Sequence, residues 1–173
     1  MEGIMLKGEK IELRAAEPSD VDVIYSWEND PENWLVSNTV APYSKHQILQ
    51  FIEEANDIFA SNQLRLIISN HQQEAVGCID LFDFDHKNKR VGLGVLVDEN
   101  HRRKGYAQEA LFLTINYCFN LLEVHGLYAE VLSSNHSSQK LFESAGFVQT
   151  GIKKEWLWAG QGFVDQIFYQ LKR

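Results

Sequence analysis

Residues 94–107 read Gly-Val-Leu-Val-Asp-Glu-Asn-His-Arg-Arg-Lys-Gly-Tyr-Ala, and the rest of the chain can be understood from this stretch. Its first four residues have the apolar character of a strand end, and apolar residues recur at helical spacing from Ala107 to Leu121. A short basic loop joins the two. A helix start leaves about four backbone N–H groups without partners and carries roughly half a positive charge. The loop over 102–107 is therefore predicted to suit phosphate oxygens, with Gly105 letting them approach the main chain.

On both sides of this unit, strand and helix patterns alternate. Strands are predicted at 10–15, 64–69, 75–84, 90–97, 127–132, 147–154 and 163–171. Helices are predicted at 18–28, 44–59, 107–121 and 137–145, the first ended by Pro31 and the second begun by a capping box of Ser44 and Gln47. We therefore expect an α+β fold, a mixed and mostly antiparallel sheet of about seven strands with four flanking helices, in one domain spanning 1–173.

Composition narrows the class of protein. The chain has 173 residues and 45% of them are hydrophobic, which is enough for one domain with a buried core. Two cysteines, Cys78 and Cys118, are too few for a disulfide framework and indicate a reducing, cytoplasmic location. No apolar run approaches the roughly 18 residues that span a bilayer, and the terminus Met1-Glu2-Gly3 lacks a signal-peptide pattern. A membrane partner is not expected.

The net charge of −8 is unevenly placed. Residues 1–60 hold four basic and twelve acidic residues, whereas residues 61–173 hold twelve of each, so all the excess acid lies in the first third. This distribution disfavours nucleic-acid binding, which needs a basic face. It would suit a cationic partner if the acids gather at a cleft. A solvated, charged helix surface is the alternative.

The motif Arg102-x-x-Gly105-x-Ala107, between a strand and a long helix, resembles the acyl-CoA signature of the GNAT acyltransferase superfamily. Two further stretches resemble later elements of that family: the strand 127–131, and Asn135 with the run 141–147. The length and the carboxyl-terminal strands are most similar to the branch that holds spermidine acetyltransferases and ribosomal-protein N-terminal acetyltransferases. The resemblance covers nearly the whole chain.

The resemblance implies an N-acetyltransferase in which an amine attacks the thioester of acetyl-CoA directly, with no metal. In relatives the strand equivalent to 94–97 is bulged and splays from the next strand. Its backbone holds the pantetheine arm and polarises the thioester oxygen, roles that the resemblance carries to Val95, Leu96 and Val97. The diphosphate is expected at Arg102, Arg103, Lys104, Gly105, Tyr106 and Ala107. Asn135 is expected to contact the pantetheine arm or to order the opposing loop.

One residue departs from the family pattern. Many members have a tyrosine that protonates the leaving thiolate, and the matching residue here is Phe142, which the resemblance still places beside the cofactor. A thiol has a pKa of about 8.5, so its thiolate is a tolerable leaving group without an acid. Tyr128 is the candidate substitute, and Tyr106 or a water molecule are the alternatives. A general acid is commonly worth 10²–10⁴-fold in rate. Phe142 thus also keeps open a non-catalytic acyl-CoA-binding module.

The acceptor side is predicted from acids and aromatic residues. Asp80 lies in the apolar run 77–81 and is the candidate base for the amine, with a solvent-facing acid as the alternative. The segment that usually roofs the acceptor cleft supplies the candidate substrate contacts Trp27, Glu28, Glu32 and Trp34, although core packing would also explain the tryptophans.

The predicted acceptor is a primary amine, either a small polyamine-like cation or a peptide N-terminus. An acyl-cysteine route through Cys78 is a further alternative. The six histidines show no paired metal spacing, so a metal ligand set is not expected. A homo-oligomer is possible.

Overall fold

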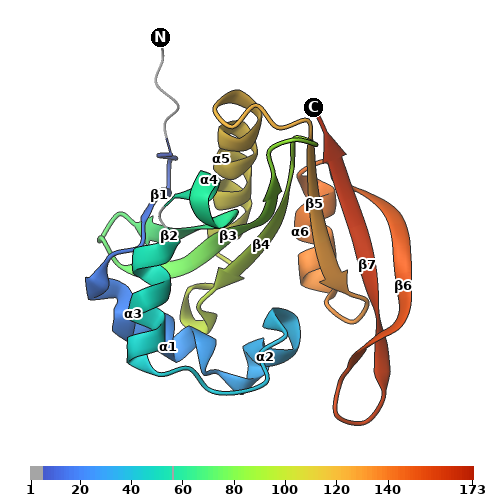
Figure 1. Ribbon diagram of the computed structural model, residues 1–173, viewed down its shortest axis with the longest axis horizontal. Helices are drawn as coiled ribbons and strands as arrows, with labels where there is room; N and C mark the ends of the chain where they lie inside the picture. The colour runs from blue at the N-terminus through green and yellow to red at the C-terminus, as the bar shows by residue number, and fades with distance from the viewer. Residues whose placement is uncertain (1–5, 56) are drawn as a thin grey trace.

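The computed structural model describes residues 6–55 and 57–173, so the Met1-Glu2-Gly3 terminus lies outside the described residues. Seven strands form one sheet in the order β1-β2-β3-β4-β5-β7-β6 (Figure 1). The strands are β1 (Ile11–Ala15), β2 (Leu64–Asn70), β3 (Ala75–Asp85), β4 (Arg90–Val97), β5 (Gly126–Leu132), β6 (Val148–Trp158) and β7 (Phe163–Lys172). Every neighbouring pair is antiparallel except β4 and β5. The predicted mixed sheet is confirmed.

The described residues form six α-helices rather than the four expected from the sequence. They are α1 (Val21–Glu28), α2 (Pro31–Ser37), α3 (Lys45–Glu54), α4 (Ile58–Ser61), α5 (Tyr106–Asn120) and α6 (His136–Ser144). Pro31 begins a helix instead of only ending one, because a proline at the first helical position loses no hydrogen bond and Asp30 caps that start. The expected single helix over 44–59 is two helices, since α3 ends at Glu54 and Asp57 caps α4.

The helices cover the sheet in two layers. On one face α5 and α6 pack against the larger core, which includes Leu93, Leu111 and Leu127, all at most 2% exposed. On the other face α1 and α3 pack against a smaller core around Ile24, Ile52 and Ile67. The central strands are buried in continuous runs because both faces are covered, and successive side chains such as Leu66 and Ile67 enter the larger and the smaller core in turn. None of the helices in the described segments is long and apolar enough to span a bilayer.

The sheet opens between β4 and β5. These two strands pair only at Arg90–Gly92 with Gly126–Tyr128, and then they separate towards α2 (Figure 1). Beyond Gly92, β4 keeps a neighbour on the β3 side alone, in continuous register to the pair of Gly77 with Val97. A bulge was expected in β4, but the register shift between β3 and β4 lies in β3, between Phe82 and Asp85. The expected splaying of β4 from β5 is present.

Candidate active site

The amino terminus of α5 lies at the end of the open part of β4. Asp98 caps a single 3₁₀ turn at Glu99–His101, and the chain then turns into α5 through Arg103 and Gly105, both with positive φ. Across residues 6–55 and 57–173, we find no protein acceptor for the backbone amides of residues 103–108. These consecutive donors at a 15-residue helix are the group of partners that an anion needs.

Gly105 is required by its surroundings. Its φ of 82° is in the left-handed region, where a side chain is strained. A Cβ at this position would also lie 2.8 Å from Lys10 Nζ. Arg102 folds back, so that its Nε donates to the Val97 carbonyl oxygen at 3.0 Å, while the side chains of Arg103 and Lys104 are exposed. The loop predicted from the sequence is thus a turn with free amides and two exposed cations at its rim.

A pocket of about 210 Å³ joins the end of β4 to α1 and α2. Its walls include Val97, Asp98 and Arg102 on one side and Ser26, Asp30 and Asn33 on the other. Trp27 borders this pocket, but it is only 5% exposed and belongs to the smaller core. Its Nε1 donates to Asp98 Oδ2 at 3.2 Å, so Trp27 ties α1 to the loop before α5. Trp27 thus packs in the smaller core and also borders the pocket, and its substrate contact stays a prediction.

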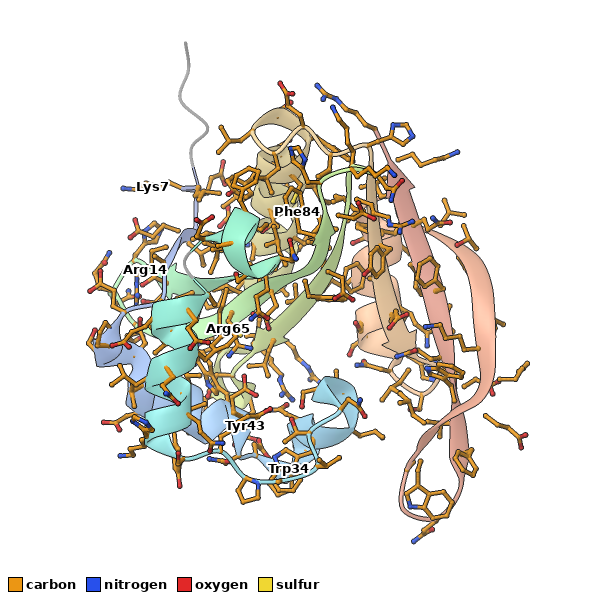
Figure 2. All side chains as sticks on the ribbon, viewed as in Figure 1. Lys7, Arg14, Trp34, Tyr43, Arg65 and Phe84 are labelled. Atoms are coloured by element: carbon orange, nitrogen blue, oxygen red, sulfur yellow. The ribbon has the colours of Figure 1, made fainter. Side chains whose placement is uncertain are left out.

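A second pocket, of about 170 Å³, lies over the middle of β2 and β3, on the face that carries α1 and α3. It is lined by Phe51, Gln63, Leu64, Arg65, Asp80, Leu81 and Phe82. Figure 2 shows Arg65 beneath α3 at the centre of the molecule. Arg65 Nε and Nη2 donate to the two oxygens of Asp80 at 2.6 and 2.8 Å, and Nη1 donates to Glu28 at 2.5 Å. The predicted Asp80 and Glu28 are thus brought together, through an arginine that the sequence reasoning missed.

Arg65 is a nearly buried charge, with a side chain 12% exposed. Burial works against its ionised form, yet the carboxylates of Asp80 and Glu28 raise the pKa of Arg65 well above its usual value. The guanidinium also lies over the ring of Phe51, 5.0 Å from its centroid. An arginine in the otherwise apolar stretch 64–68, across from an acid in the next strand, was the signal that could have identified it.

Tyr128 lies where β4 and β5 separate, opposite Gly92 in the register. Its ring packs edge-on against Phe82 at 5.7 Å and stacks on Phe168 at 5.3 Å, and its hydroxyl donates to Asp83 at 3.4 Å. Burial, followed by the nearby carboxylates, raises the pKa of Tyr128 to about 12. The raised pKa makes Tyr128 a poorer proton donor than an ordinary tyrosine, which disfavours it as the acid for the leaving thiolate.

Asn135 and Phe142 have structural partners on α6. The Asn135 side chain caps α6 by accepting from the Ser138 amide at 3.1 Å, and the two roles expected of it beside the cofactor stay predictions. Phe142 is 3% exposed and packs edge-on against Phe147, with the ring centroids 5.1 Å apart. The expected contact of Phe142 with a cofactor is not supported, because the larger core surrounds its ring.

The other predicted substrate contacts differ in placement. Trp34 is half-buried and its Nε1 donates to the Glu28 carbonyl oxygen at 2.9 Å, so it joins α2 to α1 (Figure 2). Glu32 is exposed at the start of α2. The structure brings Glu28 and Trp34 into contact and leaves Glu32 at the surface.

The two cysteines are buried. Burial raises the pKa of both Cys78 and Cys118 to about 12, so neither is a thiolate near neutral pH. The acyl-cysteine alternative is therefore disfavoured. Within the part of the chain that the structure describes, no group of three or more His, Cys, Asp and Glu residues could hold a metal ion.

Comparison with known proteins gives one consistent family. Residues 10–148 match the model of the acetyltransferase (GNAT) domain. An uncharacterized, prophage-derived N-acetyltransferase of Bacillus subtilis (strain 168) is 28% identical over 166 residues, which cover 96% of this chain and 92% of that protein. A spermidine N(1)-acetyltransferase of Vibrio cholerae is 23% identical over 142 residues, which cover 82% of this chain and 81% of that protein.

The fold is shared with a solved structure. The crystal structure of the spermidine N-acetyltransferase from Vibrio cholerae in complex with CoA and spermine matches with a TM-score of 0.87 at 20% identity, over 95% of this chain and 96% of that one. The overall fold therefore has a counterpart in an enzyme crystallised with CoA. The chain belongs to the GNAT acetyltransferase family and transfers an acetyl group to an amine nitrogen.

Proposed function

We propose that this protein transfers the acetyl group of acetyl-CoA to the primary amine of a small, cationic, polyamine-like acceptor. The observation that carries the acetyl-CoA part is the run of amides at residues 103–108 with no acceptor among the described residues, beside a strand whose edge is open. The observation that carries the acceptor part is a pocket lined by Asp80, Arg65 and aromatic rings, in which Glu28 of α1 pairs with the same guanidinium.

The residues at the start of α5 fit a diphosphate. Successive amides and a helix dipole stabilise phosphate oxygens, and Gly105 leaves the main chain open to them. Arg103 and Lys104 add positive charge at the rim. Bound there, acetyl-CoA would supply an activated acyl group on a thioester.

The open edge of β4 fits the remainder of that molecule. From Leu93 to Val97 the backbone has no strand partner on the β5 side within the described residues. An amide of Val95, Leu96 or Val97 would donate to the thioester oxygen, an effect commonly worth about 3 kcal/mol for each donor. Holding the amine and the thioester together would supply most of the remaining acceleration.

The acceptor pocket suits a protonated amine. Arg65 is paired with both Asp80 and Glu28, so the three side chains together carry one negative charge. The rings of Phe51 and Phe82 line the same pocket, and because the Arg65 guanidinium already covers one face of Phe51, Phe82 is the ring proposed to meet the cation. The relative of Vibrio cholerae that acts on spermidine is consistent with this class of acceptor.

The amine must lose a proton before it attacks, because an alkylammonium has a pKa of about 10.4. Asp80 is the proposed acceptor of that proton, directly or through water. Arg65 occupies one position on each of its oxygens, and a carboxylate oxygen has a second lone pair available. The thiolate would leave without help from Tyr128, whose proton is held too firmly.

The test is incubation of the purified protein with acetyl-CoA and a panel of amines, followed by mass spectrometry of products and an assay for free CoA. The panel contains spermidine, spermine, a monoamine of matched length, and peptides with free N-termini. The proposal expects acetylated polyamines and less product from the monoamine. If peptides are acetylated and polyamines are not, the acceptor is a peptide N-terminus and the polyamine proposal fails. Tight CoA binding without any product would indicate a binding module.

The variant Asp80→Asn tests whether Asp80 is the base that takes the proton from the amine. It should lower kcat by about 10²-fold or more, while the KM for acetyl-CoA stays unchanged. The control is Asp22→Asn, which removes an exposed carboxylate of α1 that pairs only with Lys45. Full activity of Asp80→Asn across pH 6 to 9 would rule out Asp80 as the base.

A further inference from the structure

A carboxylate of α5 is held by three consecutive backbone amides just before and within β1. Glu109 Oε1 accepts from the amide of Glu9 at 2.7 Å, and Oε2 accepts from those of Lys10 and Ile11, each at 2.9 Å. The turn that presents these amides is closed by a hydrogen bond from Gly8 N to the Ile11 carbonyl oxygen at 2.8 Å. A carboxylate in such an amide nest is strongly bound. Glu109 therefore fastens the first turn of α5 to the turn at 8–11.

The fit of this turn around Glu109 is close. A Cβ on Gly8 would lie 2.4 Å from the Glu109 carboxyl carbon, so a side chain there would displace the carboxylate from its three amides. Glu109 is the fourth residue of α5 and its own amide donates to the Gly105 carbonyl oxygen at 3.2 Å. The residue held by the nest therefore directly follows the amides at 103–108 in the first turn of α5.

Lys10 makes a second contact between the turn at 8–11 and the loop before α5. Its Nζ donates to the Lys104 carbonyl oxygen at 3.4 Å, and it occupies the space beside Gly105. In a trans peptide the C=O of one residue and the N–H of the next point in opposite directions. When Lys10 holds the Lys104 carbonyl, the Gly105 amide is directed away from Lys10. That amide is one of those without a protein acceptor in the described chain.

We propose that Lys10 and Glu109 are positioning residues that hold the diphosphate-binding turn in its binding geometry before the ligand arrives. Glu109 fixes where α5 starts relative to β1, and Lys10 fixes the orientation of the Lys104–Gly105 peptide. A turn held in this way loses less conformational freedom on binding, which favours affinity. This inference rests on the proposed function, because it concerns the same binding turn.

The first test compares Lys10→Met with Lys7→Met in steady-state kinetics. Lys7 is an exposed lysine of the same segment, so its variant removes the same charge without the contact (Figure 2). Lys10→Met should raise the KM for acetyl-CoA about 3- to 10-fold, the usual effect of one lost hydrogen bond, with kcat and the KM for the amine unchanged. With acetyl-pantetheine, which lacks the diphosphate, the two variants should match the parent protein. Lys10→Arg, which keeps a donor, should restore most of the affinity.

The second test asks whether the contact acts before the ligand binds. In ligand-free protein, the ¹⁵N order parameter of the Gly105 amide should fall in Lys10→Met and stay high in Lys7→Met. Glu109→Gln keeps one acceptor oxygen but replaces the other with an NH₂ group that cannot accept from these amides, so it should speed hydrogen exchange at residues 9–11 while the core strands keep their protection.

The outcomes separate the two proposals. If the parent protein neither binds CoA nor releases it, the proposed function fails. If it binds CoA but Lys10→Met leaves the KM for acetyl-CoA unchanged, only the positioning role is overturned. It is also overturned if the KM rises without any change in the Gly105 order parameter, because Lys10 then acts through its charge alone, or if acetyl-pantetheine is affected equally.

Discussion

Arg65 and Asp80 are direct partners across β2 and β3, and two hydrogen bonds of 2.6 and 2.8 Å join the guanidinium to both carboxylate oxygens. Glu28 reaches the same guanidinium from α1. The contact therefore links the sheet to the helix layer at the wall of the acceptor pocket. Its two carboxylates also determine the sign of the charge that an incoming amine meets.

Asp80→Leu should destabilise the protein, because it removes one partner of a nearly buried guanidinium. Glu28 remains and Asp80 is itself one-third exposed, so the expected loss in unfolding free energy is about 1–3 kcal/mol, below the value for a fully buried pair. Urea unfolding followed by circular dichroism measures it. Asp22→Asn, which breaks the exposed pair with Lys45, should leave the midpoint unchanged. Equal effects of the two variants would contradict a stabilising role of Asp80 as the partner of Arg65.

Gly105→Ala should weaken CoA binding while the fold is retained. The added Cβ meets Lys10 Nζ and the left-handed backbone costs about 1–2 kcal/mol, so the turn moves away from its binding geometry. We expect the Kd for CoA in calorimetry to rise about 10-fold or more. The control is Gly126→Ala, where a Cβ would meet nothing within 4 Å. Unchanged CoA affinity of Gly105→Ala would remove the turn from the binding site.

Neither cysteine should carry an acyl group. With a pKa of about 12, the Cys78 thiol is ionised to only about one part in 10⁴ at pH 8. Native protein should therefore resist iodoacetamide at pH 8 and become labelled at both cysteines in urea. Initial-rate patterns should be sequential rather than ping-pong, and Cys78→Ala should keep kcat. Detection of acetylated Cys78 in a quenched reaction would contradict this prediction.

Phe142→Tyr tests the departure from the family pattern. Because the ring is 3% exposed and packs on Phe147, the added hydroxyl has no access to water and should lower the unfolding free energy by about 1–3 kcal/mol. The structure predicts no gain in kcat. A gain of 10²-fold or more would show that a hydroxyl at this position reaches the leaving thiolate. Phe147→Tyr, at the neighbouring buried ring, controls for the cost of a buried hydroxyl alone.

Local patterns in the sequence accounted for most of the elements. Strand alternation placed β2, β3 and β4 within a residue or so of their observed ends, and the Ser44–Gln47 capping box placed the start of α3. The helix count was wrong where a short helix begins at a proline or an aspartate, because Pro31 and Asp57 are read equally well as turn residues.

The acceptor side was predicted less well, for a physical reason. Trp27 and Trp34 were chosen by residue type and Phe142 by its place in the family pattern. Whether such a large side chain lines a pocket or fills a core depends on neighbours that are distant in the sequence. Arg65 was missed because its partners, Asp80 and Glu28, lie 15 and 37 residues away along the chain.

The sequence alone determined local features, namely a strand, a basic turn with Gly105 and a long helix. The amides at the start of that helix lack intrahelical partners because of helix geometry itself. Tertiary structure decided everything that needs two distant segments to meet. It separates β4 from β5, buries Phe142, joins Arg65 to two acids, and brings Lys10 and the turn at 8–11 against the start of α5. Such contacts depend on sheet register and helix packing, which no short stretch of sequence encodes.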